Sequence, residues 1–209
     1  DSVTNKSNLL DRSSNLKDLV IYNGISKNKK IKDNNIDELI NKNSKDIFLI
    51  GMMSRIETYK GHIDLVKGFS KLAKSVKDKF KVYFIGEGSE EEIKNLKKII
   101  LSENLKKYFV FTGYINLDST LIASKLDLLL SLTRTYEGFG LSIVEAMSVG
   151  TPVMATNVGA VSEYLNKNNS TLVEASNIDQ ITKELTNFAE NKVLWDKRAE
   201  IGKKDILEK

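Results

Sequence analysis

The stretch LDLLLSLTRTYEGFGLSIVEAMSVGTPVMAT, residues 126–156, contains two apolar runs separated by a glycine-containing loop and a segment with helical spacing. Residues 126–132 and 151–156 each have the length and apolar character of a buried strand. Residues 140–149, between them, have the pattern of a helix. A strand, a helix and a second strand in this order predict a parallel βαβ unit with a right-handed crossover.

The alternation of strand and helix continues on both sides of this unit. Further apolar runs predict strands at residues 46–51, 81–86, 108–113 and 170–175. Helical patterns are expected at residues 88–103, 117–125, 178–190 and 193–207, and one helical stripe is formed by Leu65, Phe69, Leu72 and Val76. We therefore predict an α/β fold, a three-layer αβα arrangement built on a Rossmann-like, doubly wound parallel sheet of about six strands.

The N-terminal part of the chain is expected to stand apart from this domain. Residues 1–25 include most of the run LKDLVIYNGIS and predict a connecting segment with one short strand. Residues 26–46 are polar and show neither the helical nor the strand period, except in the short piece IDELI, residues 36–40. We assign residues 1–25 to a linker and residues 26–209 to one Rossmann-like domain.

Composition limits the classes of partner and chemistry. The chain has 209 residues, of which 41% are hydrophobic, and it carries 32 Lys and Arg against 28 Asp and Glu. The lysines are spread along the chain, which argues against nucleic acid and favours an anionic ligand or an anionic membrane surface. The sequence contains no Cys, so it has no disulfide framework, zinc-thiolate site or cysteine nucleophile.

No apolar run approaches the roughly 20 residues that a membrane-spanning helix needs, and no signal-peptide pattern opens the sequence. We expect a cytoplasmic protein, with peripheral contact at the cytoplasmic membrane face as its only membrane association.

The loop between the strand at 126–132 and the following helix has the composition of a ligand loop. Gly138 and Gly140 would let the backbone approach a ligand closely. The N–H groups of residues 140–143, at the start of a helix, form a site suited to phosphate. In a doubly wound sheet such loops meet at the carboxyl ends of the strands, where ligands bind.

Two glutamates flank this phosphate site. Glu145 lies about one turn into the helix, and its side chain leans back toward the helix start, where a carboxylate can accept hydrogen bonds from a ribose diol. Glu137 precedes the glycines and could bind the hydroxyls of whatever group the diphosphate carries. The layout suggests a sugar nucleotide.

Plainer interpretations exist for the same residues. A lone helical Glu is usually a solvated surface residue, and Gly-Phe-Gly can be an ordinary turn around a core Phe. The two glutamates could also be the acid and nucleophile of a glycoside hydrolase, which would place them about 5 Å apart for a retaining reaction. Their expected positions on opposite sides of a phosphate site argue against hydrolysis.

The segment EGFGLSIVEAMSVGTPVMATNVGAVSEYL, residues 137–165, resembles the signature of the retaining glycosyltransferases of family four, whose Glu-x7-Glu motif lies on the nucleotide-binding domain of the GT-B fold. The likeness covers most of the chain, because further motifs occur in the expected order: VIYNGIS (20–26), GMMSRIETYKGHIDLVKGF (51–69), VYFIGEGSEEEIKNL (82–96) and VFTGYIN (110–116).

The resemblance implies roles for matching positions. Glu145 is similar to the residue that binds the ribose hydroxyls, and Glu137 to the one that orients the donor sugar. The backbone cradle around sugar and diphosphate would be formed by Gly138, Phe139, Gly140, Leu141 and Ser142.

Other matching positions lie outside this loop. Arg55 and Lys60 match the cations that the family places on the donor phosphates, while Gly113 and Tyr114 match the segment that flanks the base. The turn GEG, residues 86–88, is either a donor contact or a simple strand-to-helix turn. Glu163 is implied as a structural partner near the phosphate helix, and His62 is expected in a surface or capping role.

The leaving diphosphate gains negative charge as the glycosidic bond breaks, and something must stabilise it. The sequence has no Asp-x-Asp and only one His, so no metal and no cofactor are expected. Arg55, Lys60 and the helix start can take this role. The substrate would be a UDP- or GDP-linked hexose, and the base cannot be read from the chain.

A complete enzyme of this type has two Rossmann-like halves, and 209 residues are too few for both. We expect the donor-binding half, with the saccharide or lipid-linked acceptor bound by an N-terminal domain that the sequence lacks, and little or no transfer by this chain alone. Surface polysaccharide or glycolipid synthesis is the implied setting. A sugar-nucleotide epimerase, a phosphorylase and a non-catalytic nucleotide-sugar binder stay open. Ser54 and Ala160 replace common family glycines, which bears on loop shape and donor choice.

Overall fold

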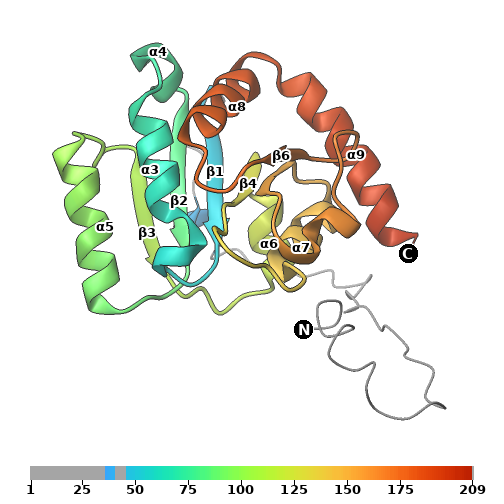
Figure 1. The fold of residues 1–209 in the computed structure, drawn as a ribbon, viewed down its shortest axis with the longest axis horizontal. Coiled ribbons are helices and arrows are strands. Elements are labelled where there is room, and N and C mark those ends of the chain that lie inside the picture. The colour runs from blue at the N-terminus through green and yellow to red at the C-terminus, as the bar shows by residue number, and fades with distance from the viewer. Residues whose placement is uncertain (1–35, 41–45, 209) are drawn as a thin grey trace, which may run out of the picture.

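The computed structural model describes residues 36–40 and 46–208, and its centre is a parallel sheet of six strands (Figure 1). The strand order is β3-β2-β1-β4-β5-β6. The strands are β1 (Phe48–Met53), β2 (Phe80–Ile85), β3 (Phe109–Gly113), β4 (Leu128–Ser131), β5 (Val153–Thr156) and β6 (Thr171–Val173). The predicted doubly wound sheet of about six strands is confirmed. The segment assigned to a linker, residues 1–25, lies outside the described residues.

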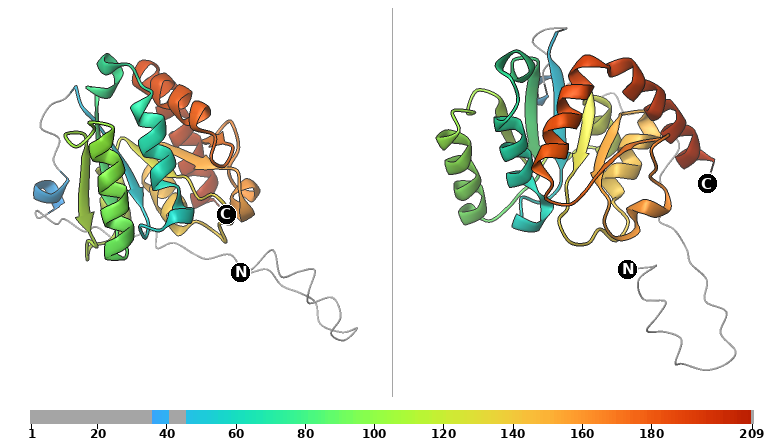
Figure 2. Two further views of the ribbon diagram at one scale, coloured as in Figure 1. Left: turned by 60° about the vertical axis from the view of Figure 1, so that its left-hand side comes forward. Right: turned by 45° about the horizontal axis from the view of Figure 1, so that its top comes forward.

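Helices cover both faces of the sheet, which gives the predicted three layers (Figures 1 and 2). They are α2 (Ile36–Leu39), α3 (His62–Ser70), α4 (Lys74–Lys77), α5 (Glu90–Ser102), α6 (Ser119–Ser124), α7 (Leu141–Val149), α8 (Ile178–Glu190) and α9 (Lys192–Leu207). Two short 3-10 helices, η1 (Thr58–Lys60) and η2 (Gly159–Glu163), follow β1 and β5.

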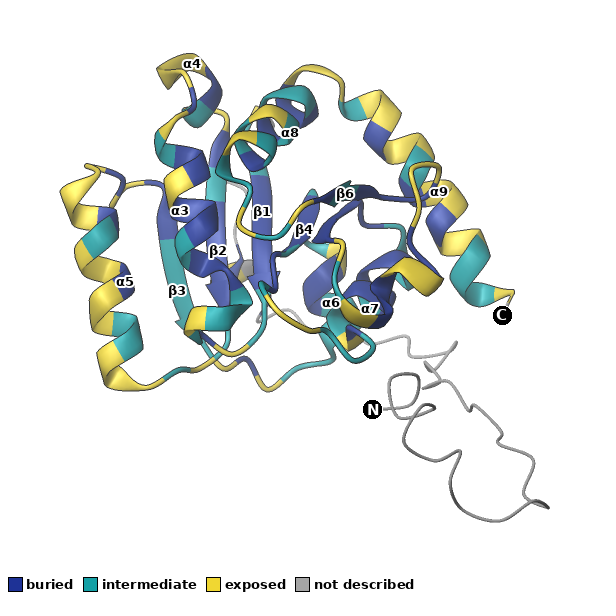
Figure 3. Ribbon diagram, viewed as in Figure 1, coloured by how far each residue is buried: buried dark blue, intermediate teal, exposed yellow. Residues whose placement is uncertain are grey.

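Alternation along each strand produces two cores. In β4, Leu128 and Leu130 belong to a buried cluster that includes residues of α3, α5 and α8, whereas Leu129 belongs to a second cluster with residues of α6 and α7. Successive side chains of a strand point to opposite faces, so a strand covered on both sides must be apolar throughout. The run LLL in β4 meets this requirement, and Figure 3 shows the central strands β1 and β4 mostly in the colour of buried residues.

One helix differs from the predicted pattern. The stripe Leu65, Phe69, Leu72 and Val76 is buried, as expected, but it does not lie on one helix. Helix α3 ends at Ser70, Leu72 lies in the connection, and Val76 belongs to α4. Ala73 is extended and starts α4, so the chain turns there without a Gly or Pro to mark the break.

The strand order reverses between β1 and β4, and this switch positions the site. The chain runs outward from β1 to β2 and β3, then crosses to β4 and runs the other way to β5 and β6. The connections leaving β1 and β4 therefore diverge to opposite sides and open a crevice at the carboxyl ends of these two strands. Among the described residues, no helix combines the length and the apolar character needed to cross a bilayer.

Candidate functional site

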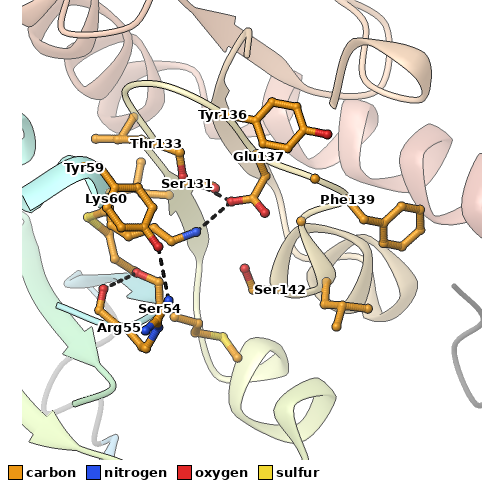
Figure 4. Close-up of a pocket in the computed structure, with 17 residues that line it drawn as sticks. Ser54, Arg55, Tyr59, Lys60, Ser131, Thr133, Tyr136, Glu137, Phe139 and Ser142 are labelled. Carbon is orange, nitrogen blue, oxygen red and sulfur yellow. Dashed lines mark hydrogen bonds and ion pairs between the residues drawn. The ribbon is translucent and has the colours of Figure 1, made fainter. Parts of the chain in front are cut away.

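A cavity of about 730 Å³ lies at this switch point (Figure 4). Its walls come from the end of β1 and the loop that follows it, from the end of β4 and its loop, and from the start of α7. The lining residues are Met52, Met53, Ser54, Arg55, Tyr59, Lys60, Leu130, Ser131, Leu132, Thr133, Tyr136, Glu137, Gly138, Phe139, Gly140, Leu141 and Ser142.

Most of the residues predicted from the sequence meet in this cavity. The two cations predicted to bind phosphate and the whole loop from Glu137 to Ser142 line it. Glu145, Gly113 and Tyr114 are not part of the lining, and Tyr114 is exposed. The proposed roles of these three residues toward ribose and base therefore stay predictions.

Lys60 and Glu137 form an ion pair across the cavity. The Lys60 ammonium donates to Glu137 Oε2 at 2.9 Å, and Thr133 Oγ1 donates to the same oxygen at 3.2 Å (Figure 4). Both charged side chains are largely buried, at 18% and 17% exposure. An ammonium has three donors, so Lys60 can hold Glu137 and still donate to a phosphate oxygen in the cavity.

Arg55 lies at the rim and is 70% exposed. Its guanidinium contacts Glu57 at 2.7 Å and donates to the Tyr59 hydroxyl at 3.2 Å. Glu57 is less accessible, at 24% exposure. The exposed Arg55 guanidinium has five N–H donors, so it can contact Glu57 and still donate to an anion in the cavity.

Helix α7 begins with its amide groups directed at this cavity. Gly140 is the N-cap in a left-handed conformation (φ 74°), and no side chain caps the helix. The first N–H groups of a helix have no partner within it and carry the positive end of the helix dipole. Leu141 and Ser142, the first two residues of α7, line the cavity, which makes this end a suitable position for an anion.

The two cavity loops are held against each other by close backbone contacts. Gly61, at φ 79°, follows η1 and lies against Leu132, the residue after β4, so that a Cβ there would be 2.0 Å from the Leu132 carbonyl oxygen. The Arg134 N–H donates to the Tyr59 carbonyl at 2.7 Å. The Arg134 side chain also forms a bidentate pair with buried Asp64 at 2.8 and 2.7 Å.

The GEG turn supports the Arg55 loop and does not line the cavity. A Cβ on Gly86 would lie 2.1 Å from the Ser54 carbonyl oxygen, and one on Gly88 would lie 2.4 Å from the Ile56 carbonyl oxygen. Of the two alternatives for this turn, the structural one fits these contacts, because both glycines are needed for close backbone packing.

Sequence reasoning missed three residues that shape the site. Thr133 binds Glu137, Tyr59 contacts Arg55, and Tyr164 donates from its hydroxyl to the Phe139 carbonyl. Tyr164 follows Glu163 in the motif GAVSEYL, but only folding brings it under the glycine loop. Within residues 36–40 and 46–208, no group of three or more His, Asp or Glu side chains could hold a metal ion.

The expected surface or capping role of His62 is wrong. The side chain is 2% exposed and packs edge-on against Phe84, with ring centroids 4.9 Å apart. Burial, and then the charge of Lys60, lower the pKa of His62 from 6.5 to about 4, and the Glu57 backbone opposes this only in part. Neither ring nitrogen makes a well-directed hydrogen bond to the described residues.

This burial predicts a loss of stability in acid. Between pH 6.5 and about 4 the unfolded chain protonates His62 while the folded chain does not. His62 therefore costs no stability above pH 6.5, and the free energy of unfolding falls between pH 6.5 and about 4, by on the order of 3 kcal/mol in total. Urea unfolding at pH 7.5 and 5 should show this slope, and His62→Phe should reduce it. An NMR titration of this single histidine that gave an ordinary pKa would contradict the prediction.

Comparison with known proteins agrees with the fold and the motifs. The family profile described as Glycosyl transferases group 1 matches residues 32–206. The chain is 29% identical over 163 residues to poly(ribitol-phosphate) alpha-N-acetylglucosaminyltransferase of Staphylococcus aureus, covering 77% of this chain and 32% of that protein. It is 32% identical over 128 residues to 2-deoxystreptamine glucosyltransferase of Streptomyces kanamyceticus, covering 61% and 32%. The chain thus spans about a third of the length of these curated relatives.

Solved structures share the architecture. The C-terminal domain of the glycosyl transferase group 1 family protein LpcC from Francisella tularensis aligns with a TM-score of 0.69 and 27% identity, covering 78% of this chain and 85% of that one. HepE of Anabaena, in complex with UDP-glucose, aligns with a TM-score of 0.79 and 22% identity, covering 91% and 52%. The chain belongs to the glycosyl transferases group 1 family and corresponds to the C-terminal domain of its GT-B fold.

Proposed function

We propose that this chain is the donor-binding half of a retaining glycosyltransferase, which moves a hexose from a nucleoside-diphosphate sugar to a saccharide or lipid-linked acceptor. One observation carries the proposal. A single cavity brings together the uncapped start of α7, the Arg55 and Lys60 cations and the Glu137 carboxylate. Such a cavity offers donors for a diphosphate beside an acceptor for sugar hydroxyls.

The arrangement suits departure of a diphosphate. Negative charge grows on the leaving oxygen in the transition state, and donors already fixed in place stabilise it without reorganisation. Lys60 is held by Glu137, and the α7 amides are fixed by the helix, so both are in position before substrate arrives. We propose that transfer needs neither a metal nor a further cofactor.

The setting and the acceptor are inferred from relatives. Besides the Staphylococcus enzyme, the chain is similar to an O-antigen biosynthesis glycosyltransferase of Escherichia coli and to poly(glycerol-phosphate) alpha-glucosyltransferase of Bacillus subtilis. We propose a role in surface polysaccharide or glycolipid synthesis, in the cytoplasm or at the cytoplasmic membrane face. An acceptor-binding domain outside this chain would complete the site.

Calorimetric titration of the chain with UDP, GDP and their hexose conjugates tests the proposal. Binding of a diphosphate, with clear preference over the matching nucleoside, is expected. Absence of binding by every member of the panel would contradict the donor site. Release of an altered sugar nucleotide without acceptor would favour an epimerase, and cleavage of a plain glycoside would favour a hydrolase.

The two glutamates should separate in their effects. Glu145→Ala is expected to weaken nucleoside diphosphate binding about tenfold, because it removes a charged acceptor for two ribose hydroxyls. Glu137→Ala should leave that affinity less changed and reduce hexose transfer at least about tenfold when the acceptor-binding half is supplied. Titration and transfer rates of both variants check this, and the reverse pattern would refute the assignment of roles.

A further inference from the structure

The loop between Glu137 and Gly140 is fixed from one side by the segment that follows β5. The Ala160 N–H donates to the Glu137 carbonyl at 3.0 Å. The Tyr164 hydroxyl donates to the Phe139 carbonyl. The carbonyls of Glu137 and Phe139 therefore point toward η2 and Tyr164, respectively.

The N–H groups of the same two peptides point in the opposite direction to their carbonyls. All peptide bonds of the described residues are trans, and in a trans peptide the C=O and the next N–H point in opposite directions. The N–H groups of Gly138 and Gly140 are consequently directed away from η2. Both glycines line the cavity, so these two donors face the space in front of α7.

Tyr164 is well suited to hold the second of these peptides. The side chain is 8% exposed, and its ring packs against Phe139 with centroids 5.7 Å apart. The absence of a side chain at Gly140 gives the hydroxyl room, because a Cβ there would lie 3.0 Å from the Tyr164 oxygen. Burial, followed by the charges of Glu137 and Glu163, raises the pKa of Tyr164. The phenol therefore stays protonated and remains a donor.

We propose that Tyr164 is a positioning residue for the donor diphosphate: its hydroxyl fixes the Phe139 carbonyl and thereby directs the Gly140 N–H at an oxygen of the second phosphate, the one farther from the nucleoside. This inference rests on the proposed function. Without the hydroxyl, the peptide between Phe139 and Gly140 can rotate, and a carbonyl oxygen would then face the phosphate in place of the N–H. Loss of the hydroxyl should therefore weaken binding of the phosphates and leave the contacts of the base and ribose unchanged.

The test compares Tyr164→Phe with Tyr108→Phe in this chain. Tyr108 is buried to the same degree, at 7% exposure, and its hydroxyl donates to Asp78 at 2.6 Å, before β2 and β3 and far from the cavity. Kd values for UMP and UDP are measured for both variants, with GMP and GDP as the parallel pair. We expect Tyr164→Phe to lower the preference for diphosphate over monophosphate about tenfold and Tyr108→Phe to leave it unchanged.

Each result decides the matter. An unchanged preference in Tyr164→Phe, or an equal loss of UMP and UDP affinity, would overturn the positioning role while leaving the donor site intact. Failure of the unmodified chain to bind UDP or GDP would overturn the proposed function and this inference with it. Saturating UDP should also slow amide hydrogen exchange at Gly138 and Gly140 about tenfold in the unmodified chain, and unchanged exchange at both would count against the proposal.

Discussion

Replacing Lys60 with Met is expected to weaken nucleoside diphosphate binding to this chain about 100-fold. The substitution removes a largely buried cation from the phosphate site and leaves Glu137 without its ion-pair partner. Loss of a charge-assisted hydrogen bond to a phosphate costs about 1.5–3 kcal/mol, and the unpaired negative charge of Glu137 then repels the phosphates as well. Calorimetric titration with UDP and GDP measures the change.

A second variant separates these two causes. In the double variant Lys60→Met with Glu137→Gln, the unpaired charge is gone, so any remaining loss reports the contact between Lys60 and phosphate. We expect affinity to stay at least about tenfold below that of the unmodified chain. Lys71→Met is the control, because Lys71 forms an exposed pair with Asp179 at 2.7 Å outside the cavity. If the double variant bound nucleoside diphosphates as tightly as the unmodified chain, Lys60 would only neutralise Glu137 and would not contact phosphate.

Gly159→Ala should strongly destabilise the loop that carries Glu137. Gly159 has a positive φ of 62°, and a Cβ there would lie 2.2 Å from the Glu137 carbonyl oxygen and 2.7 Å from its nitrogen. Both are backbone atoms, so the clash displaces the loop that carries Glu137. We expect a loss of about 3–5 kcal/mol in the free energy of unfolding, from backbone strain and overpacking together.

Gly150→Ala is a matched control for the strain alone. Gly150 has a positive φ of 84°, but a Cβ there would meet only the flexible Lys203 side chain, at 3.5 Å. This variant should lose about 1–2 kcal/mol and keep its affinity for nucleoside diphosphates. Urea unfolding and UDP titration of both variants give the comparison. Equal stability losses would show that the loop can move aside.

Local pattern was enough to predict the strands and most helices. The strand expected at 126–132 is observed at Leu128–Ser131, and the helix expected at 178–190 is observed with those bounds. The first is a nearly continuous apolar run, the second has the helical period, and polar residues bound both. The break between α3 and α4 was not predictable in this way, because residues 70–74 contain neither Gly nor Pro, and Gly68 lies inside α3.

The features of the site that were not predicted depend on contacts between residues far apart in the sequence. Lys60 and Glu137 were each expected near the donor, yet their contact joins residues 77 positions apart and depends on β1 lying next to β4. The burial of His62 likewise follows from its place against Phe84 of β2, although its position after Lys60 and Gly61 suggested a surface or capping role. Strand adjacency is a property of the whole topology, so no local window contains it.

Two contacts hold the cavity loops together: Gly61 lies against Leu132, and Arg134 pairs with Asp64. The two segments that carry Lys60 and Glu137 are already immobilised when the protein folds, so ligand arrival requires little further ordering entropy. New donor preferences can then arise by exchanging side chains such as Ser54 or Met53 on an unchanged frame. A rigid contact between the two loops would thus allow the neighbouring lining residues to be substituted without loss of the phosphate site.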